Sequence, residues 1–236
     1  MPSHRWMPVL LLTVLLAMPA MTAANAQTVG VATSVRPNAE GVVGGNAQTL
    51  SPGSQLYANQ LVRTGNLGIA DLVFIDNTNL KVGPISEVKL DKFVYDPVGS
   101  SGKVVMNMTR GAFRFVTGTQ ASRVYQVDTP YGTLGVRGTV VEIVVAERMA
   151  RKAGVECVTK LRLVSGTGAT YRTFSGKVAT LTEPDQVACI TPSGDVIYST
   201  SSESILGFDV AEGEPPGVSV PPPGGTTPPP VSPTRP

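Results

Sequence analysis

Between residues 28 and 210 the hydrophobic and polar residues alternate with a period close to two, the repeat of a half-buried β-strand. Turn-forming pairs such as Asp76-Asn77 and Gly83-Pro84 separate the alternating runs. The strand-like runs cover residues 29–35, 56–63, 69–75, 80–82, 87–94, 104–108, 113–116, 124–127, 133–136, 140–145, 155–164, 169–174, 178–181, 187–191 and 196–198. No series of helix-length connectors joins them. The pattern therefore predicts an all-β fold: a single antiparallel β-sandwich or β-roll domain over residues 27–210.

One stretch, residues 146–152, departs from this pattern because it consists of good helix formers and concentrates charge. We expect a solvated helical turn between two strands there. A protrusion that contacts a partner is the alternative interpretation.

The first 26 residues are typical of a secretory signal peptide. Arg5 precedes an apolar run over residues 9–17, and Ala24-Asn25-Ala26 supplies small residues at a cleavage site. We expect cleavage after Ala26 and an exported protein that is periplasmic or secreted. The apolar run is shorter than the roughly 20 residues of a membrane span, and no later window reaches that length. We therefore expect no membrane span in the mature chain.

The other end of the chain is rich in proline. From Pro215 to Pro236, 10 of 22 residues are proline, which fixes φ and cannot donate to a sheet. We expect a disordered, extended tail over residues 211–236. The tail either acts as a spacer or has no function of its own.

Charge is sparse, since Asp, Glu, Lys and Arg make up 15% of the chain and the net charge is +2. About 25% charged residues is typical, and a nucleic-acid-binding protein would show a clustered basic face. Loss of the signal peptide would also remove His4, the one histidine. Ser-His-Asp catalysis, Cys-His catalysis and histidine-ligated zinc are then excluded. We therefore expect that the protein binds no nucleic acid, catalyses no reaction, and holds neither a cofactor nor a metal ion.

Cys157 and Cys189 are the two cysteines of the chain. An even count in an exported protein favours a disulfide, with two buried free thiols as the alternative. Alternation places Cys157 on the same side of its run as Leu161 and Leu163, opposite Arg162. We therefore expect Cys157 to point into the core.

Five segments resemble, in their order and spacing, the FecR-domain family: residues 61–65, 70–78, 80–90, 111–118 and 127–139. The last of these, which ends in Gly135-Val136-Arg137-Gly138-Thr139, is the most specific. The resemblance is clear over residues 56–145. It implies an extracytoplasmic all-β domain without catalytic activity. The name-giving members of the family are membrane regulators that pass a surface signal to a sigma factor in iron uptake.

The chain departs from the family pattern in several places. Asn59-Gln60 stands where Gly-Asp is usual, and residues 76–78 read Asp-Asn-Thr where Asp-Gly-Ser is usual. Because Asn77 can adopt a positive φ, we expect the second turn to form. The sequence shows no cytoplasmic anti-sigma segment and no internal membrane span. It therefore resembles the exported, free-standing members of the family, and we do not expect it to control a sigma factor directly.

Arg137 is the candidate site residue of the most specific segment. It lies between Gly135 and Gly138 on an apolar strand, so a buried Arg137 would need an acceptor, which Asp128 or Glu142 could supply. A structural ion pair is the first interpretation. A binding site for an anionic ligand or a partner is the second.

These observations predict a non-enzymatic, periplasmic protein-interaction or sensory accessory module of the cell envelope. It would bind an envelope protein partner through strand edges and loops. A structural or glycan-binding (peptidoglycan-binding) envelope protein is the alternative, and a carboxylate-dependent enzyme comes third. The candidate platforms for sugar stacking, which could equally be half-buried packing residues, are Tyr57, Tyr95, Tyr131 and Tyr171.

Overall fold

The computed structural model describes residues 27–94, 103–118, 125–145 and 156–208. All regular secondary structure in these residues is β-strand, which confirms the all-β prediction. The predicted signal peptide (1–26), the helical stretch 146–152 and the proline-rich tail (211–236) lie outside the described residues. In the part of the chain that is described, no helix is long and apolar enough to cross a membrane.

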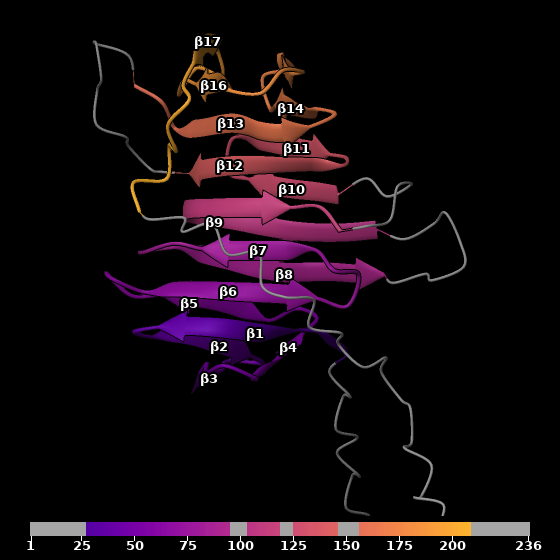
Figure 1. Cartoon of the computed structure of the whole chain (residues 1–236), viewed down its shortest axis with the longest axis vertical. Helices are drawn as coiled ribbons and strands as arrows, with labels where there is room; N and C mark the ends of the chain where they lie inside the picture. The colour runs from indigo at the N-terminus through magenta and orange to yellow at the C-terminus, as the bar shows by residue number, and fades with distance from the viewer. Residues whose placement is uncertain (1–26, 95–102, 119–124, 146–155, 209–236) are drawn as a thin grey trace, which may run out of the picture.

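The strands form two sheets that enclose one hydrophobic core, as expected for a sandwich or roll. In spatial order, sheet A consists of β4 (Gln55–Tyr57), β1 (Thr28–Arg36), β6 (Ile69–Phe74), β7 (Asn79–Val82), the second part of β9 (Lys103–Val116), β12 (Thr139–Val145), β13 (Thr159–Gly166), β16 (Gln186–Ile190) and β17 (Val196–Thr200). All of these neighbours are antiparallel. Figure 1 shows the strands stacked from β3 and β4 at one end to β16 and β17 at the other.

Sheet B lies on the other side of the core. In spatial order it consists of β3 (Asn46–Thr49), β2 (Ala39–Val43), β5 (Leu61–Thr64), β8 (Glu87–Val94), the first part of β9, β10 (Tyr125–Thr129), β11 (Gly132–Val136), β14 (Ala169–Thr173) and β15 (Val178–Leu181). β9 and β10 run parallel, whereas the other neighbours are antiparallel. Sheet B is thus mixed, and the prediction of a purely antiparallel domain is wrong at this pair. β9 begins in sheet B and ends in sheet A. The chain then returns to sheet B as β10, which lies beside the first part of β9 and runs in the same direction.

β9 belongs to both sheets. Its first residues pair with β8, and its last residues, from Gly111 on, pair with β12. The change of sheet occurs at Gly111, which has a φ of +111°. A Cβ at this position would overlap the backbone of Ser86, so both the conformation and the close approach require glycine. The sequence predicts two separate strands over residues 104–108 and 113–116. In the structure they form one strand, because the bend at Gly111 does not interrupt the backbone pairing.

The predicted run 56–63 is divided into β4 and β5. The chain turns at Asn59, whose φ is +64°. The sequence did not reveal this turn, because apolar and polar residues alternate on both sides of it and together resemble a single strand. The hairpin of β2 and β3 was not predicted from the sequence. Its turn is formed by Gly44 and Gly45, both with positive φ, but the four residues of β3 are all exposed and show no alternation.

The hairpin of β6 and β7 closes as expected, with Asn77 at a φ of +62°. The carboxylate of the buried Asp76 organises this turn. Its Oδ1 accepts a hydrogen bond from Thr78 N (3.0 Å), and its Oδ2 accepts from Thr78 Oγ1 and Tyr125 Oη (2.8 Å each). The hydroxyl of Tyr125 therefore ties β10 of sheet B to a turn of sheet A. Burial raises the pKa of Tyr125 to about 12.

The core runs the length of the stack between the sheets. It contains apolar side chains from both, and the largest fully buried ones are Tyr125, Tyr171, Phe74, Phe113, Phe115, Leu56, Leu72, Leu80, Met106, Met108 and Leu134. Phe115 and Tyr125 pack edge to face, with their ring centroids 5.5 Å apart. The rings join β9 and β10 across the two layers.

We predict that Gly111→Ala destabilises the domain more than a glycine replacement in an open turn. The substituted residue would keep a strained φ and would also collide with the Ser86 backbone, which together should cost about 2 to 5 kcal/mol. Gly176→Ala is the matched control, because Gly176 has a φ of +88° but nothing within 4 Å of its added Cβ. The free energies of unfolding come from urea titrations. Equal losses for the two variants would contradict the importance of the close approach.

Candidate functional site

A cavity of about 360 Å³ lies at the end of the stack where β2, β3 and β4 meet. It is lined by Gly41, Val43, Asn46, Gln48, Thr49, Leu50, Ser54, Gln55, Tyr57 and Gln60. Seven of these ten side chains are uncharged and carry an amide or a hydroxyl group, and none is ionised near neutral pH. The lining is therefore rich in hydrogen-bonding groups without carrying charge.

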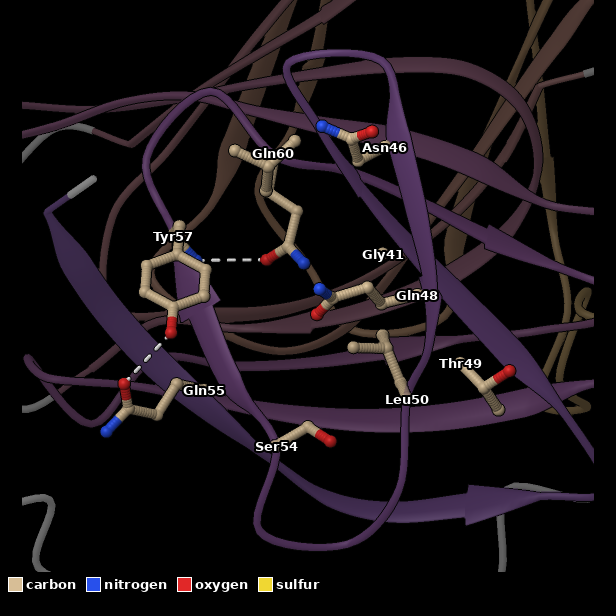
Figure 2. Close-up of a pocket in the computed structure, with 10 residues that line it drawn as sticks. Gly41, Asn46, Gln48, Thr49, Leu50, Ser54, Gln55, Tyr57 and Gln60 are labelled. Carbon is tan, nitrogen blue, oxygen red and sulfur yellow. Dashed lines mark hydrogen bonds between the residues drawn. The ribbon is translucent and has the colours of Figure 1, made fainter. Parts of the chain in front are cut away.

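Gln60 is the buried polar residue of this cavity, with 3% of its surface exposed. Its backbone is held on both sides, since Gln60 N donates to Tyr57 O (3.2 Å) and Gln60 O accepts from Leu90 N (2.8 Å). The side-chain Oε1 accepts from Tyr57 N (2.9 Å). Figure 2 shows the amide reaching between Tyr57 and Gln48. The turn between β4 and β5 thus fixes one amide group inside the cavity.

Of the tyrosines expected as sugar platforms, Tyr57 is the one that lines this cavity. Its hydroxyl donates to Gln55 Oε1 (3.1 Å). Tyr171 is fully buried, its hydroxyl lies 2.7 Å from Thr129 Oγ1, and burial raises its pKa. Tyr131 is half-buried, and Tyr95 lies outside the described residues. Tyr171 is thus a packing residue and is not available for stacking.

The structure places Arg137, Asp128 and Glu142 in three different surroundings. Arg137 is exposed in the turn between β11 and β12, where its carbonyl oxygen accepts from Thr139 Oγ1 (2.7 Å) and Thr167 Oγ1 (2.6 Å). Arg137 is therefore not the buried arginine that would require an acidic partner. Asp128 accepts hydrogen bonds from Thr133 Oγ1 (2.7 Å) and Gln126 Nε2 (3.0 Å).

Glu142 is fully buried and forms an ion pair with Arg162, at 3.3 Å between Oε2 and Nη1. Arg162 also reaches Asp185 Oδ1 (2.7 Å), and Arg114 Nη1 lies 4.0 Å from Glu142 Oε1. Because residues 142, 114 and 162 are cross-strand neighbours in β12, β9 and β13, these side chains form one row across sheet A. Sequence reasoning selected Glu142 but did not select Arg162, because the register between distant strands is not visible in the chain.

A segment that we call the C-terminal strap, residues 201–208, covers this charged row. Arg162 donates to Ser201 O (2.7 Å) and Ser202 O (2.9 Å), and Glu142 Oε2 accepts from Ile205 N (3.0 Å). Further along, the ring of Phe208 lies over Gly83 at the end of β7. The strap keeps the ion pair out of water and supplies it with backbone partners, so the row serves the fold.

Cys157 and Cys189 form a disulfide, as expected, with Cα atoms 5.4 Å apart. Cys157 does not point into the core, which corrects the expectation from alternation. β13 begins at Thr159, so the strand period does not extend back to Cys157. Cys157 is half-buried, and Cys189 lies opposite Lys160, outside the cluster of core residues. The disulfide fastens the loop before β13 to β16.

Comparison with known proteins identifies the central part of the chain. The family model described as FecR protein matches residues 60–160. We refer to this matched segment, residues 60–160, as the FecR domain. The FecR domain extends from the turn before β5 to the start of β13, which agrees with the resemblance read from the sequence motifs. Of the residues that line the cavity, Gln60 alone falls within the FecR domain.

Two solved structures are similar to the chain. Each is the crystal structure of a candidate anti-sigma factor from Parabacteroides distasonis ATCC 8503, with 10% sequence identity. The TM-scores are 0.47 and 0.46, and each alignment covers 59% of this chain. The matched region spans 59% of the length of each solved chain. None of the curated proteins matches the chain.

The cavity was missed by sequence reasoning except for Tyr57. The available signal was the density of amide residues over positions 46–60, which include Asn46, Gln48, Gln55 and Gln60. That signal is weak because such residues are common in turns. Within the described residues, no group of three or more His, Cys, Asp or Glu side chains could hold a metal ion.

We predict that Arg162→Ala destabilises the protein by about 3 to 5 kcal/mol, because it leaves the Glu142 carboxylate buried without its partner. Lys89→Ala is the control, since Lys89 pairs with Asp91 at 3.0 Å and both side chains are about half exposed. This control should cost less than about 1 kcal/mol. Urea unfolding of both variants measures the difference. Comparable losses would show that the strap does not bury the pair in solution.

We predict that loss of the disulfide lowers the free energy of unfolding by roughly 3 to 4 kcal/mol, because 32 positions separate the two cysteines and the bond constrains the unfolded chain. The measurement is urea unfolding with and without a reductant. The double variant Cys157→Ser, Cys189→Ser should match the reduced protein and should not respond to reductant. A reductant-independent midpoint for the unaltered chain would contradict the bond.

Proposed function

We propose that this chain is a non-enzymatic accessory module of the cell envelope that acts in signalling by binding another protein in the periplasm. The FecR domain supports a regulatory role, since the family to which it belongs is regulatory and not catalytic. The signal-peptide-like sequence of residues 1–26 supports export. A disulfide between Cys157 and Cys189 is what an oxidising compartment favours.

The observation that carries a protein-binding role is the exposed end of sheet A. β17 is its last strand, and among the described residues no strand pairs with its outer edge. Ile197 and Tyr198 of this strand are 41% and 52% exposed. Two further exposed hydrophobic residues, Phe174 and Val178, belong to the last hairpin of sheet B at the same end of the stack.

An edge strand with apolar side chains offers two complementary kinds of contact. Its outward N–H and C=O groups can pair with an extended segment of another chain, and its side chains then supply apolar contacts. β15 is the last strand of sheet B at this end. Its Thr180 N already donates a hydrogen bond to Tyr198 Oη (3.0 Å), so this backbone group has a partner within the chain. β17 is therefore the edge that we assign to the partner.

The test is capture of the partner in cells that express the full chain with an affinity tag. In-cell crosslinking, purification and mass spectrometry should enrich one envelope protein. Ile197→Lys should reduce its recovery about tenfold or more, because a lysine on the edge strand opposes pairing and removes an apolar contact. Binding assays with the purified pair would give the same ratio as a change in Kd.

Leu67→Lys is the matched control, since Leu67 is 76% exposed in the turn before β6 and far from β17 in the sheet order. This variant should retain the partner. Recovery that is unchanged in Ile197→Lys, or no enriched protein at all, would overturn the proposal. A partner lost equally from both variants would place binding elsewhere on the surface.

A further inference from the structure

We infer that the cavity between β2, β3 and β4 is a binding site for an uncharged saccharide, with Gln60 Nε2 as its central hydrogen-bond donor. The inference does not rest on the proposed function. The cavity and β17 lie at opposite ends of the stack, so either site can be present without the other (Figure 1).

The first argument is an unused donor. Gln60 is almost fully buried as a residue, and its Oε1 accepts from Tyr57 N, whereas its Nε2 forms no hydrogen bond with the residues that the structure describes and keeps access to the cavity. Figure 2 shows this nitrogen directed toward Gln48 and Gly41 in the middle of the cavity. An N–H that faces the space of the cavity is available to a ligand, and a ligand oxygen would accept from it in place of water.

The second argument is the space beside this donor. A Cβ on Gly41 would overlap Gln60 Nε2 and would lie 3.0 Å from Leu50 Cδ2. Gly41 therefore gives the amide its position and leaves the floor of the cavity open. The cavity of about 360 Å³ lies at the small end of the range for ligand sites, roughly 300 to 1,000 Å³, and suits one or two sugar rings.

The third argument is the chemistry of the lining. Amide groups both donate and accept hydrogen bonds, as sugar hydroxyls do, and Asn46, Gln48 and Gln55 line the cavity together with Gln60. No lining residue carries a charge that would favour an anionic or cationic ligand. A purely apolar ligand would leave the amides unpaired. The ring of Tyr57 and the side chain of Leu50 supply the apolar surface that the C–H face of a sugar needs.

An extended peptide is a poorer match for this cavity than a sugar. A peptide needs a row of backbone groups along a strand edge, whereas the polar groups here converge on one space from β3, β4 and the turn after β4. Convergent groups in a concave site are typical of small-ligand binding. The same site would accept a terminal unit of a longer neutral glycan.

The experiment uses the purified chain and a printed array of neutral oligosaccharides, acidic oligosaccharides and uncharged peptides, followed by calorimetric titration of the best neutral saccharide. We expect binding to one or more neutral saccharides. Gln60→Glu keeps an acceptor for Tyr57 N but removes the donor, so it should weaken the Kd by about tenfold or more. Gly41→Ala should weaken it similarly by displacing the Gln60 amide.

Gln186→Glu is the matched control, because Gln186 Oε1 also accepts from backbone N–H groups, including Thr182 N (2.8 Å), but lies at the other end of the stack. This variant should bind like the unaltered chain. Thermal melting identifies any variant that fails to fold, and Gly41→Ala then decides the outcome if Gln60→Glu is unstable. Absence of neutral saccharide binding, a preference for acidic saccharides or peptides, or an unchanged Kd in the folded variants would overturn the inference. None of these results would alter capture through β17.

Discussion

The structure depends on one strand that is shared by two sheets. β9 pairs with β8 in sheet B and, past Gly111, with β7 and β12 in sheet A. Every other strand is placed by hydrogen bonds that lead back to β9 in one sheet or the other. The two layers consequently have a fixed relative register, and the core residues Phe113 and Phe115 of β9 lie between them. The bend is available only because Gly111 combines a positive φ with close contact to Ser86.

The outer face of sheet A shows how burial changes the role of charged residues. Lys81 and Asp71 form a partly exposed pair at 3.4 Å, whereas Glu142 and Arg162 in the same sheet are almost completely buried. Exposed pairs contribute little to stability, but a buried pair must be complete because neither charge can be left alone. The strap contributes backbone hydrogen bonds to this pair, because Ser201 O accepts from Arg162 and Ile205 N donates to Glu142 Oε2. Residues beyond the last strand are thus part of the folded unit.

The FecR domain occupies the middle of the stack, and the two ends are formed largely by residues outside it. One end presents the exposed strand β17, and the other holds the amide-lined cavity with Gln60. The ends of a stacked sheet are its open edges, where backbone groups and core surface lack the next strand.

The sequence by itself determined the all-β class, the short strands, the turn at Asn77, the disulfide between Cys157 and Cys189 and the FecR resemblance. These are local properties, set by alternation, by turn residues and by a count of two cysteines. It did not determine the parallel pairing of β9 with β10, the ion pair of Glu142 with Arg162, or the cavity around Gln60. Each of these depends on which distant segments become neighbours. Tertiary structure decided them because strand register and burial arise from packing between segments that are far apart in the chain.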